Sequence, residues 1–102
     1  MKTLQYSFAQ IEAFATIAET GSLSRAAIRL GKDRTTLRDL LDYLEDALGY
    51  HLFSREGRTL ILTAEGEQLF RQAHLLLRQA QAFESFAQTL PQTTGQADRK
   101  SV

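Results

Sequence analysis

The sequence contains no cysteine, so it forms neither a disulfide nor a thiolate site for a metal or for redox chemistry. It also lacks an apolar run of about 18 residues, the length that a transmembrane helix requires. The stretch Met1–Gln10 does not follow the basic, apolar and small-residue order of a signal peptide. These absences predict a cytoplasmic protein without a membrane segment.

Histidine is scarce as well. The two copies, His51 and His74, are 23 residues apart and lack the paired spacing of a metal site. The serine, threonine and acidic residues are scattered, with no base placed to activate a nucleophile. We therefore expect no metal, no cofactor and no enzymatic activity.

The chain has no net charge, because 12 basic residues balance 12 acidic ones. The charges are unevenly distributed, however. Gly21–Leu40 holds five basic and two acidic residues, a net of +3, whereas Leu41–Leu62 holds two basic and four acidic residues, a net of −2. The length of 102 residues corresponds to one domain. Within this neutral chain, the positive segment indicates a local surface that attracts anions.

The segment Gly21–Gly49 predicts two helices joined by a tight turn, which is the layout of a helix-turn-helix. Serine and aspartate are favoured N-caps, and glycine ends a helix readily in the left-handed conformation. The predicted helices are Leu23–Leu30, between Ser22 and Gly31, and Arg34–Leu48, between Asp33 and Gly49. Each has an apolar face, formed by Leu23, Ala26, Ala27 and Leu30 in the first and by Leu37, Leu41, Leu44 and Leu48 in the second.

The segments on either side complete a small mainly α-helical domain. Ser7–Ala18 has apolar residues at helical spacing, and we interpret it as a third helix that closes the core rather than as part of a ligand pocket. After Gly49, the apolar pair Leu52-Phe53, a turn at Glu56-Gly57 and the β-rich Thr59–Leu62 predict a two-stranded hairpin, or wing. The fold class is thus a winged helix-turn-helix.

A long helix is predicted from Thr63, its N-cap, to about Leu90, where Pro91 should end it. Apolar residues recur at alternating steps of four and three, a 3.5-residue repeat typical of helix pairing. We call them the seam: Leu69, Ala73, Leu76, Ala80, Phe83, Ala87 and Leu90. Pairing with a second copy is favoured over folding back, because a helix of about 40 Å exceeds what three short helices can cover.

A second apolar set on this helix leaves two alternatives open. Phe70, Leu77 and Phe86 lie to one side of the seam, where they pack against the opening helix or join the dimer interface. The polar remainder, residues 91–102, is interpreted as a hinge or disordered tail. The expected division is 1–62 for the DNA-binding domain, 63–90 for a linker and dimerisation helix, and 91–102 for the tail.

Several motifs, in order, resemble the N-terminal DNA-binding part of LysR-type transcriptional regulators, over about residues 7 to 90. The matching residues are Ala18-Glu19-Thr20-Gly21-Ser22-Leu23-Ser24-Arg25-Ala26-Ala27 with Leu30, Leu44-Glu45-Asp46-Ala47-Leu48-Gly49, Leu52-Phe53-Ser54-Arg55, Arg58 in the wing, and Leu62-Thr63-Ala64-Glu65-Gly66. The resemblance implies a homodimer through antiparallel linker helices, possible tetramers of the full-length protein, and binding to interrupted palindromic double-stranded operators. The family's effector domain, which binds a small molecule, is absent from this sequence, so we expect a fragment of a longer protein rather than a naturally short one.

The second helix of the pair is the expected reader of the DNA major groove. The candidate DNA-binding residues are Ser24, Arg25, Lys32, Arg34, Thr35, Thr36, Arg38, Asp39, Asp42, Arg55 and Arg58. Arg38 contacts a guanine or pairs with Asp42 one turn away. Asp39 accepts from a cytosine amino group or pairs with a neighbouring arginine. The family often has Ser-Arg-Gln where this chain has Arg38-Asp39-Leu40, so the family's base contacts are not carried over.

The wing arginines have two interpretations too: contact with DNA beside the helix, or ordinary solubilising residues. At the level of the whole chain, the favoured function is sequence-specific DNA binding by a homodimer that regulates transcription. The alternative is a winged helix for protein interaction and dimerisation that has lost DNA affinity through its acidic second helix. The positive charge of Gly21–Leu40 favours DNA.

Overall fold

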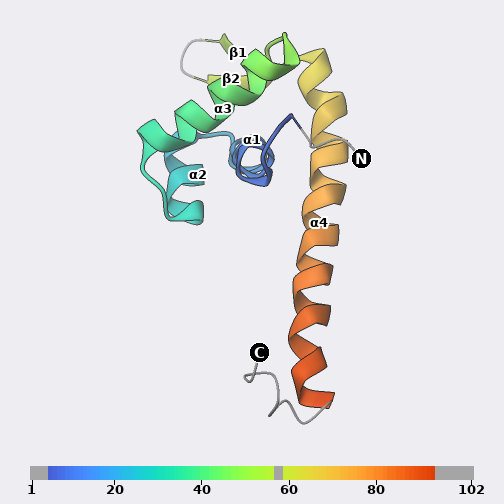
Figure 1. The fold of residues 1–102 in the computed structure, drawn as a ribbon. Coiled ribbons are helices and arrows are strands. Elements are labelled where there is room, and N and C mark those ends of the chain that lie inside the picture. The colour runs from blue at the N-terminus through green and yellow to red at the C-terminus, as the bar shows by residue number, and fades with distance from the viewer. Residues whose placement is uncertain (1–4, 57–58, 94–102) are drawn as a thin grey trace.

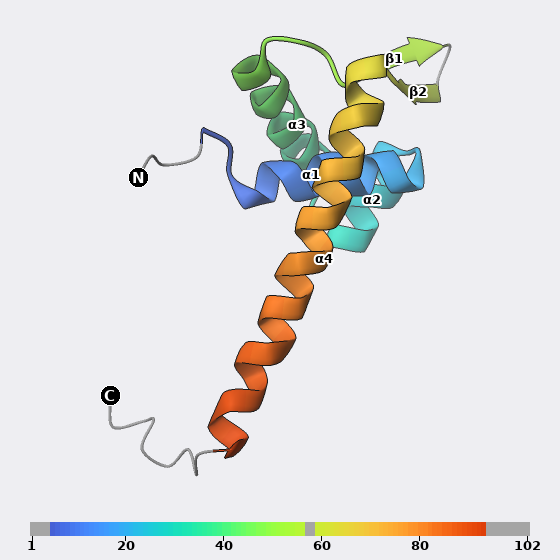
Figure 2. The same ribbon diagram turned by 90° about the vertical axis from the view of Figure 1, so that its right-hand side faces the viewer.

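The computed structural model describes residues 5–56 and 59–93. Three helices and a hairpin form one body, and a long C-terminal helix extends well beyond it (Figures 1 and 2). In chain order the elements are α1 (Phe8–Thr20), α2 (Leu23–Leu30), α3 (Arg34–Leu48), β1 (Phe53–Glu56), β2 (Thr59–Leu62) and α4 (Ala64–Thr93). The predicted helix-turn-helix, the third helix and the wing are all present.

Local hydrogen bonds fix where the first helices begin. The Ser7 hydroxyl accepts from the N–H of Gln10 at 3.1 Å, and the Gln10 side chain accepts from the N–H of Ser7 at 3.2 Å, which together form a capping box. Ser22 caps α2 by accepting from the N–H of Arg25 at 3.1 Å. The helix α1 continues to Thr20, two residues past the predicted end, because the left-handed residue that stops it is Gly21 (φ 73°).

The N-cap of α3 differs from its predicted form. Asp33 occupies the position, and its carbonyl accepts from the N–H of Leu37 at 3.1 Å. Its carboxylate makes no capping bond to the backbone, however. Hydrogen bonding by the Thr36 side chain is instead the main cause that lowers the pKa of Asp33.

The core is built around α1, which contacts α2, α3 and α4. The Phe14 ring is fully buried and meets Phe53 of the wing and Phe70 of α4 edge to face, with centroids 5.7 and 6.4 Å apart. Ala26 and Ala27 of α2 are buried as well, and their small side chains allow α3 to cross closely. The predicted packing role of the opening helix is therefore confirmed.

The wing is an antiparallel pair in which Phe53 faces Leu62 and Glu56 faces Thr59. Leu52, predicted to belong to the apolar pair that opens the wing, is buried but precedes β1. Arg55 lies in β1 opposite Leu60. The predicted wing residue Arg58 lies outside the described residues.

The start of α4 has the predicted cap and one close backbone approach. The Thr63 hydroxyl accepts from the N–H of Gly66 at 2.9 Å. A Cβ at Gly66 would overlap the carbonyl oxygen of Leu52, so only glycine fits there without movement.

The predicted end of α4 at Leu90 is wrong, since the helix continues through Pro91 to Thr93. Proline lacks a backbone donor and its ring crowds the carbonyl four residues earlier, which disfavours a helix without forbidding it. Residues 91–93 thus belong to the helix rather than to the predicted tail, and the rest of that tail, 94–102, lies outside the described residues.

Candidate nucleic-acid interface

The helix α3 presents one face to the core and the opposite face to solvent. Leu37, Leu41 and Leu44 are buried. At 100° per residue the outward ridge opposite them consists of four exposed residues. They are Thr35, Asp39, Asp42 and Asp46. The ridge is uncharged at its N-terminal end and acidic thereafter.

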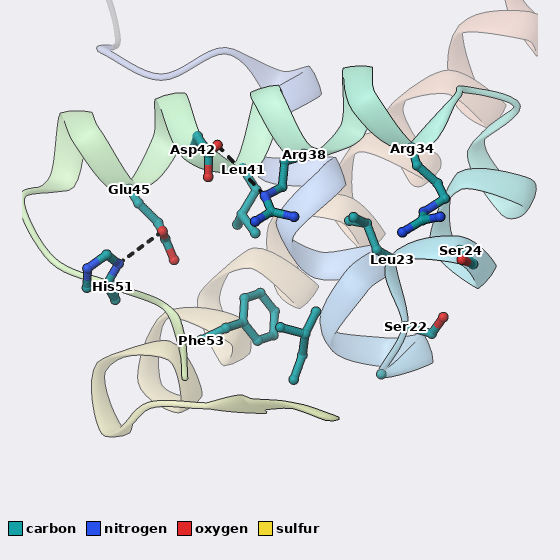
Figure 3. A pocket seen from close by; sticks show the side chains of 12 residues that line it. Ser22, Leu23, Ser24, Arg34, Arg38, Leu41, Asp42, Glu45, His51 and Phe53 are labelled. Atoms are coloured by element: carbon teal, nitrogen blue, oxygen red, sulfur yellow. Dashed lines mark hydrogen bonds and ion pairs between the residues drawn. The ribbon is translucent and has the colours of Figure 1, made fainter. Parts of the chain in front are cut away.

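A hollow runs along one flank of α3, between that helix, the start of α2 and the wing (Figure 3). Arg34 and Arg38 extend into it from α3, and Ser22 and Ser24 line it from the start of α2. Phe53 forms part of its wall on the wing side. Two arginines and two hydroxyls therefore share one surface with the N-terminal half of α3.

Arg38 and Asp42 form the predicted i,i+4 pair, although the pair is loose. Arg38 Nε lies 3.9 Å from Asp42 Oδ2, beyond hydrogen-bond range, and the two side chains are 48% and 54% exposed. Pairs this open contribute little stability, so DNA can displace the carboxylate from the guanidinium. The contact between Arg38 and a base stays a prediction.

The other candidate residues on α2, in the turn and at the start of α3 are all exposed. Ser24 and Arg25 are exposed on α2, Lys32 is exposed in the turn, and Thr35 and Thr36 are exposed on the first turn of α3. Arg29 differs from these basic residues, because its guanidinium is bound to Glu19 at 2.9 Å.

Glu45 is a positioning residue whose role the sequence did not reveal. Its side chain is only 13% exposed, and its Oε2 accepts from the N–H of Leu52 at 2.7 Å. The other oxygen, Oε1, lies 3.2 Å from Nδ1 of His51, as Figure 3 shows. The Thr63 hydroxyl donates to the carbonyl of His51 at 2.9 Å. This network ties α3 to the wing and to the start of α4.

Glu19 plays a similar part at the other end of the domain. One carboxylate oxygen binds Arg29 of α2 at 2.9 Å, and the other lies 3.6 Å from Nδ1 of His74 on α4. Glu19 lies in the motif Ala18-Glu19-Thr20 and Glu45 in the motif Leu44-Glu45-Asp46. Membership in these motifs is the one signal in the sequence that could have indicated their roles.

The residues of the seam on α4 differ in how deeply they are buried. Ala73 is 4% exposed in the core of its own protomer, and Leu69 packs against that core. Phe70 and Leu77 also pack there, whereas Phe86 is 64% exposed. Most of the side chains further along are more exposed. Their exposed fractions are 44% for Leu76, 73% for Phe83 and 49% for Leu90, with Ala80 half-buried and Ala87 exposed.

Within residues 5–56 and 59–93, no three histidine or acidic side chains are grouped as metal ligands. In the same residues, no helix is both long and apolar enough to cross a bilayer.

Fold and surface together define a winged helix-turn-helix with a long C-terminal helix. The family model described as "Bacterial regulatory helix-turn-helix protein, lysR family" matches residues 8–67. The chain therefore belongs to the LysR family.

Its relatives include transcriptional regulators. The chain is 42% identical over 69 residues to the HTH-type transcriptional regulator DgdR of Burkholderia cepacia, covering 68% of this chain and 24% of the relative. It is 38% identical over 86 residues to a probable hydrogen peroxide-inducible genes activator of Mycobacterium xenopi, covering 84% and 46%. The chain thus spans less than half the length of either relative.

Solved structures share the fold. The oxidized form of OxyR from Corynebacterium glutamicum matches with a TM-score of 0.79 and 36% identity, covering 84% of this chain and 28% of that one. The BenM DNA-binding domain in complex with benA site 1 DNA matches with a TM-score of 0.74 and 25% identity, covering 82% and 94%.

Proposed function

We propose that this chain is the DNA-binding part of a transcription regulator and binds double-stranded DNA sequence-specifically. The observation that carries the proposal is the exposed N-terminal half of α3, with Arg34 and Arg38 on its flank beside the hydroxyls of Ser22 and Ser24. A helix of this kind fits the major groove, where arginine bonds guanine bidentately. The likeness to the BenM DNA-binding domain, which was solved in complex with DNA, supports DNA binding by this chain.

The other candidate residues take positioning roles in this proposal. Ser24, Arg25 and Lys32 meet phosphates beside the groove, and Thr35 and Thr36 contact a thymine methyl or a phosphate. The arginines of the wing, Arg55 and Arg58, reach a phosphate or the neighbouring minor groove. Phosphate contacts fix the register of the protein on the duplex, while the α3 side chains read its sequence.

The proposed active species is a homodimer paired through α4, with residues 1–62 as the DNA-binding unit and 63–93 as the linker helix. Two features support it. Phe83, in the second half of the seam, and Phe86 beside it are largely exposed. The first half lines an apolar hollow, formed by Tyr6, Ile11, Phe14, Leu44, Leu48, Leu69, Gln72, Ala73 and Leu76. An antiparallel partner helix would set its exposed aromatic residues over this hollow.

A dimer carries two copies of α3 and therefore reads two half-sites, as in an interrupted palindrome. In the full-length protein, higher assembly and a small-molecule effector would involve segments beyond this chain. The proposed location is the cytoplasm, with the regulator bound to the chromosome, and neither a cofactor nor an enzymatic step is part of the proposal.

A second candidate function is protein interaction without DNA binding. It is favoured by the three carboxylates on the α3 ridge, Asp39, Asp42 and Asp46, which repel phosphates. The arginines on the flank of the same helix and the loose state of the Arg38 pair favour DNA instead.

Fluorescence-anisotropy titration of the purified chain with genomic DNA fragments at about 50 and 200 mM salt tests the proposal. We expect binding that weakens steeply with salt, by an order of magnitude or more, because phosphate contacts release counterions. Arg55→Ala should flatten that dependence for all sequences, since the wing contact carries no sequence information. An absence of salt-sensitive binding to any fragment would contradict the proposal and favour the second candidate.

A further inference from the structure

The acidic ridge of α3 contains one carboxylate placed to read a base. We propose that Asp39 is a specificity determinant, which selects cytosine at one position of each half-site by accepting a hydrogen bond from its N4 amino group. The inference rests on the proposed function, because it assigns a base to the same α3 face.

Position along the helix separates Asp39 from the other ridge carboxylates. The N-terminal half of a recognition helix meets base edges, while the rest leaves the groove. Asp39 lies four residues after Thr35, in the second turn of α3, and both side chains are exposed on the ridge. Asp46 lies seven residues further on, about 10 Å along the axis at 1.5 Å per residue, and so falls outside the half that meets bases.

Within the described residues, Asp39 differs from Asp42 in having no arginine opposite its carboxylate. The carboxylate of Asp42 faces the guanidinium of Arg38, and Arg29 is bound to Glu19. Among the ion pairs and side-chain hydrogen bonds of residues 5–56 and 59–93, none involves the Asp39 carboxylate. The arginine on this part of α3 therefore faces Asp42, and the exposed Asp39 carboxylate is an acceptor without a protein partner in the same residues.

The chemistry of that acceptor restricts the base. An ionised carboxylate accepts hydrogen bonds and donates none. In the major groove guanine offers the acceptors N7 and O6 and thymine the acceptor O4, both of which repel a carboxylate. Adenine combines its N6 donor with the acceptor N7, whereas cytosine offers only its N4 donor. Cytosine is therefore the base that Asp39 favours.

Selection from random duplexes, followed by titration of single-base variants of the selected site, tests the assignment on the 102-residue chain. The parent should select cytosine at one position per half-site, with other bases weakening binding by roughly 5- to 150-fold, the range for one base contact. Asp39→Ala should remove that preference. Asp39→Asn should transfer it to adenine, because an amide donates to N7 and accepts from N6.

Asp46→Asn is the matched control, since it removes the same charge from the same ridge. It should strengthen binding to unrelated DNA to the same degree as Asp39→Asn and leave every base preference unchanged. Unaltered preferences in both Asp39 variants, on a site that the parent does select, would overturn the role of Asp39 alone. If the parent selects no sequence at all, the proposed function fails with it.

Discussion

The close approach of Gly66 to the wing yields a prediction in which two effects oppose each other. Gly66 is a helical residue in the first turn of α4, where alanine ordinarily stabilises a helix by about 0.5–1 kcal/mol. Here, however, the added Cβ would overlap the carbonyl oxygen of Leu52 and lie 3.0 Å from a methyl carbon of Leu62. The backbone cannot yield as a flexible side chain can, because the Leu52 carbonyl also accepts from the N–H of Thr63 at 3.0 Å.

Overpacking costs about 1–3 kcal/mol, and overlap with a fixed backbone atom lies in the upper part of that range, so the cost exceeds the gain in helix propensity. We therefore expect Gly66→Ala to lower the free energy of unfolding by about 1–2 kcal/mol. With a urea dependence of roughly 1 kcal/mol/M for a small domain, the unfolding midpoint should fall by about 1–2 M.

The assay is urea unfolding followed by circular dichroism at one fixed protein concentration, because dimerisation couples stability to concentration. Gln68→Ala, two residues further along α4 at an exposed position, is the control that changes helix propensity without a steric contact. A Gly66→Ala protein as stable as its parent, or more stable, would refute the reasoning and show that α4 and the wing can separate freely.

Three further predictions concern the site and the seam. Glu45→Ala should destabilise the chain by about 1.5–3 kcal/mol because it leaves the N–H of Leu52 unpaired, and Glu45→Gln should cost less. Equal losses of stability in urea unfolding of the two variants would contradict the hydrogen-bond argument. Phe83→Asp should weaken dimerisation, measured by sedimentation. If the variant sediments with the same mass as the parent, the interface lies elsewhere. Arg38→Ala should cost about 1–3 kcal/mol on the cognate site and relax one base preference, and full retention of both would remove Arg38 from readout.

The sequence predicted the fold well because each helix end has a local chemical cause. Ser7 and Ser22 cap α1 and α2 through bonds to residues three positions away, which a linear pattern can show. The predicted end of α4 was wrong because proline disfavours a helix but does not prevent two further helical residues after it. The expected capping bond from the Asp33 side chain is missing as well. The sequence could not show this, because the bond depends on how that side chain is oriented.

The site was less predictable because its organisation is tertiary. A heptad repeat shows that a helix has an apolar stripe but not what covers it, so it could not divide the seam between Ala73 in the core and Phe83 in solvent. The i,i+4 spacing predicted that Arg38 could pair with Asp42, but it could not show how tight the pair is. Only the folded chain shows that the pair is loose, with 3.9 Å between Arg38 Nε and Asp42 Oδ2.

The two glutamates of the motifs connect these observations to the way in which a dimer would read DNA. In a dimer paired through α4, the distance between two recognition helices depends on the angle that α3 keeps to α4. Glu45 holds the segment from α3 to the wing, to which Thr63 at the start of α4 is bonded, and Glu19 binds Arg29 of α2 and lies near His74 of α4. Because these contacts connect the helix-turn-helix to α4 and do not belong to its base-reading face, loss of either should alter half-site spacing before it alters base preference. Affinity measured on operators whose half-sites are moved apart by single base pairs separates the two effects, since a Glu19→Gln protein should tolerate a wider set of spacings while selecting the same half-site.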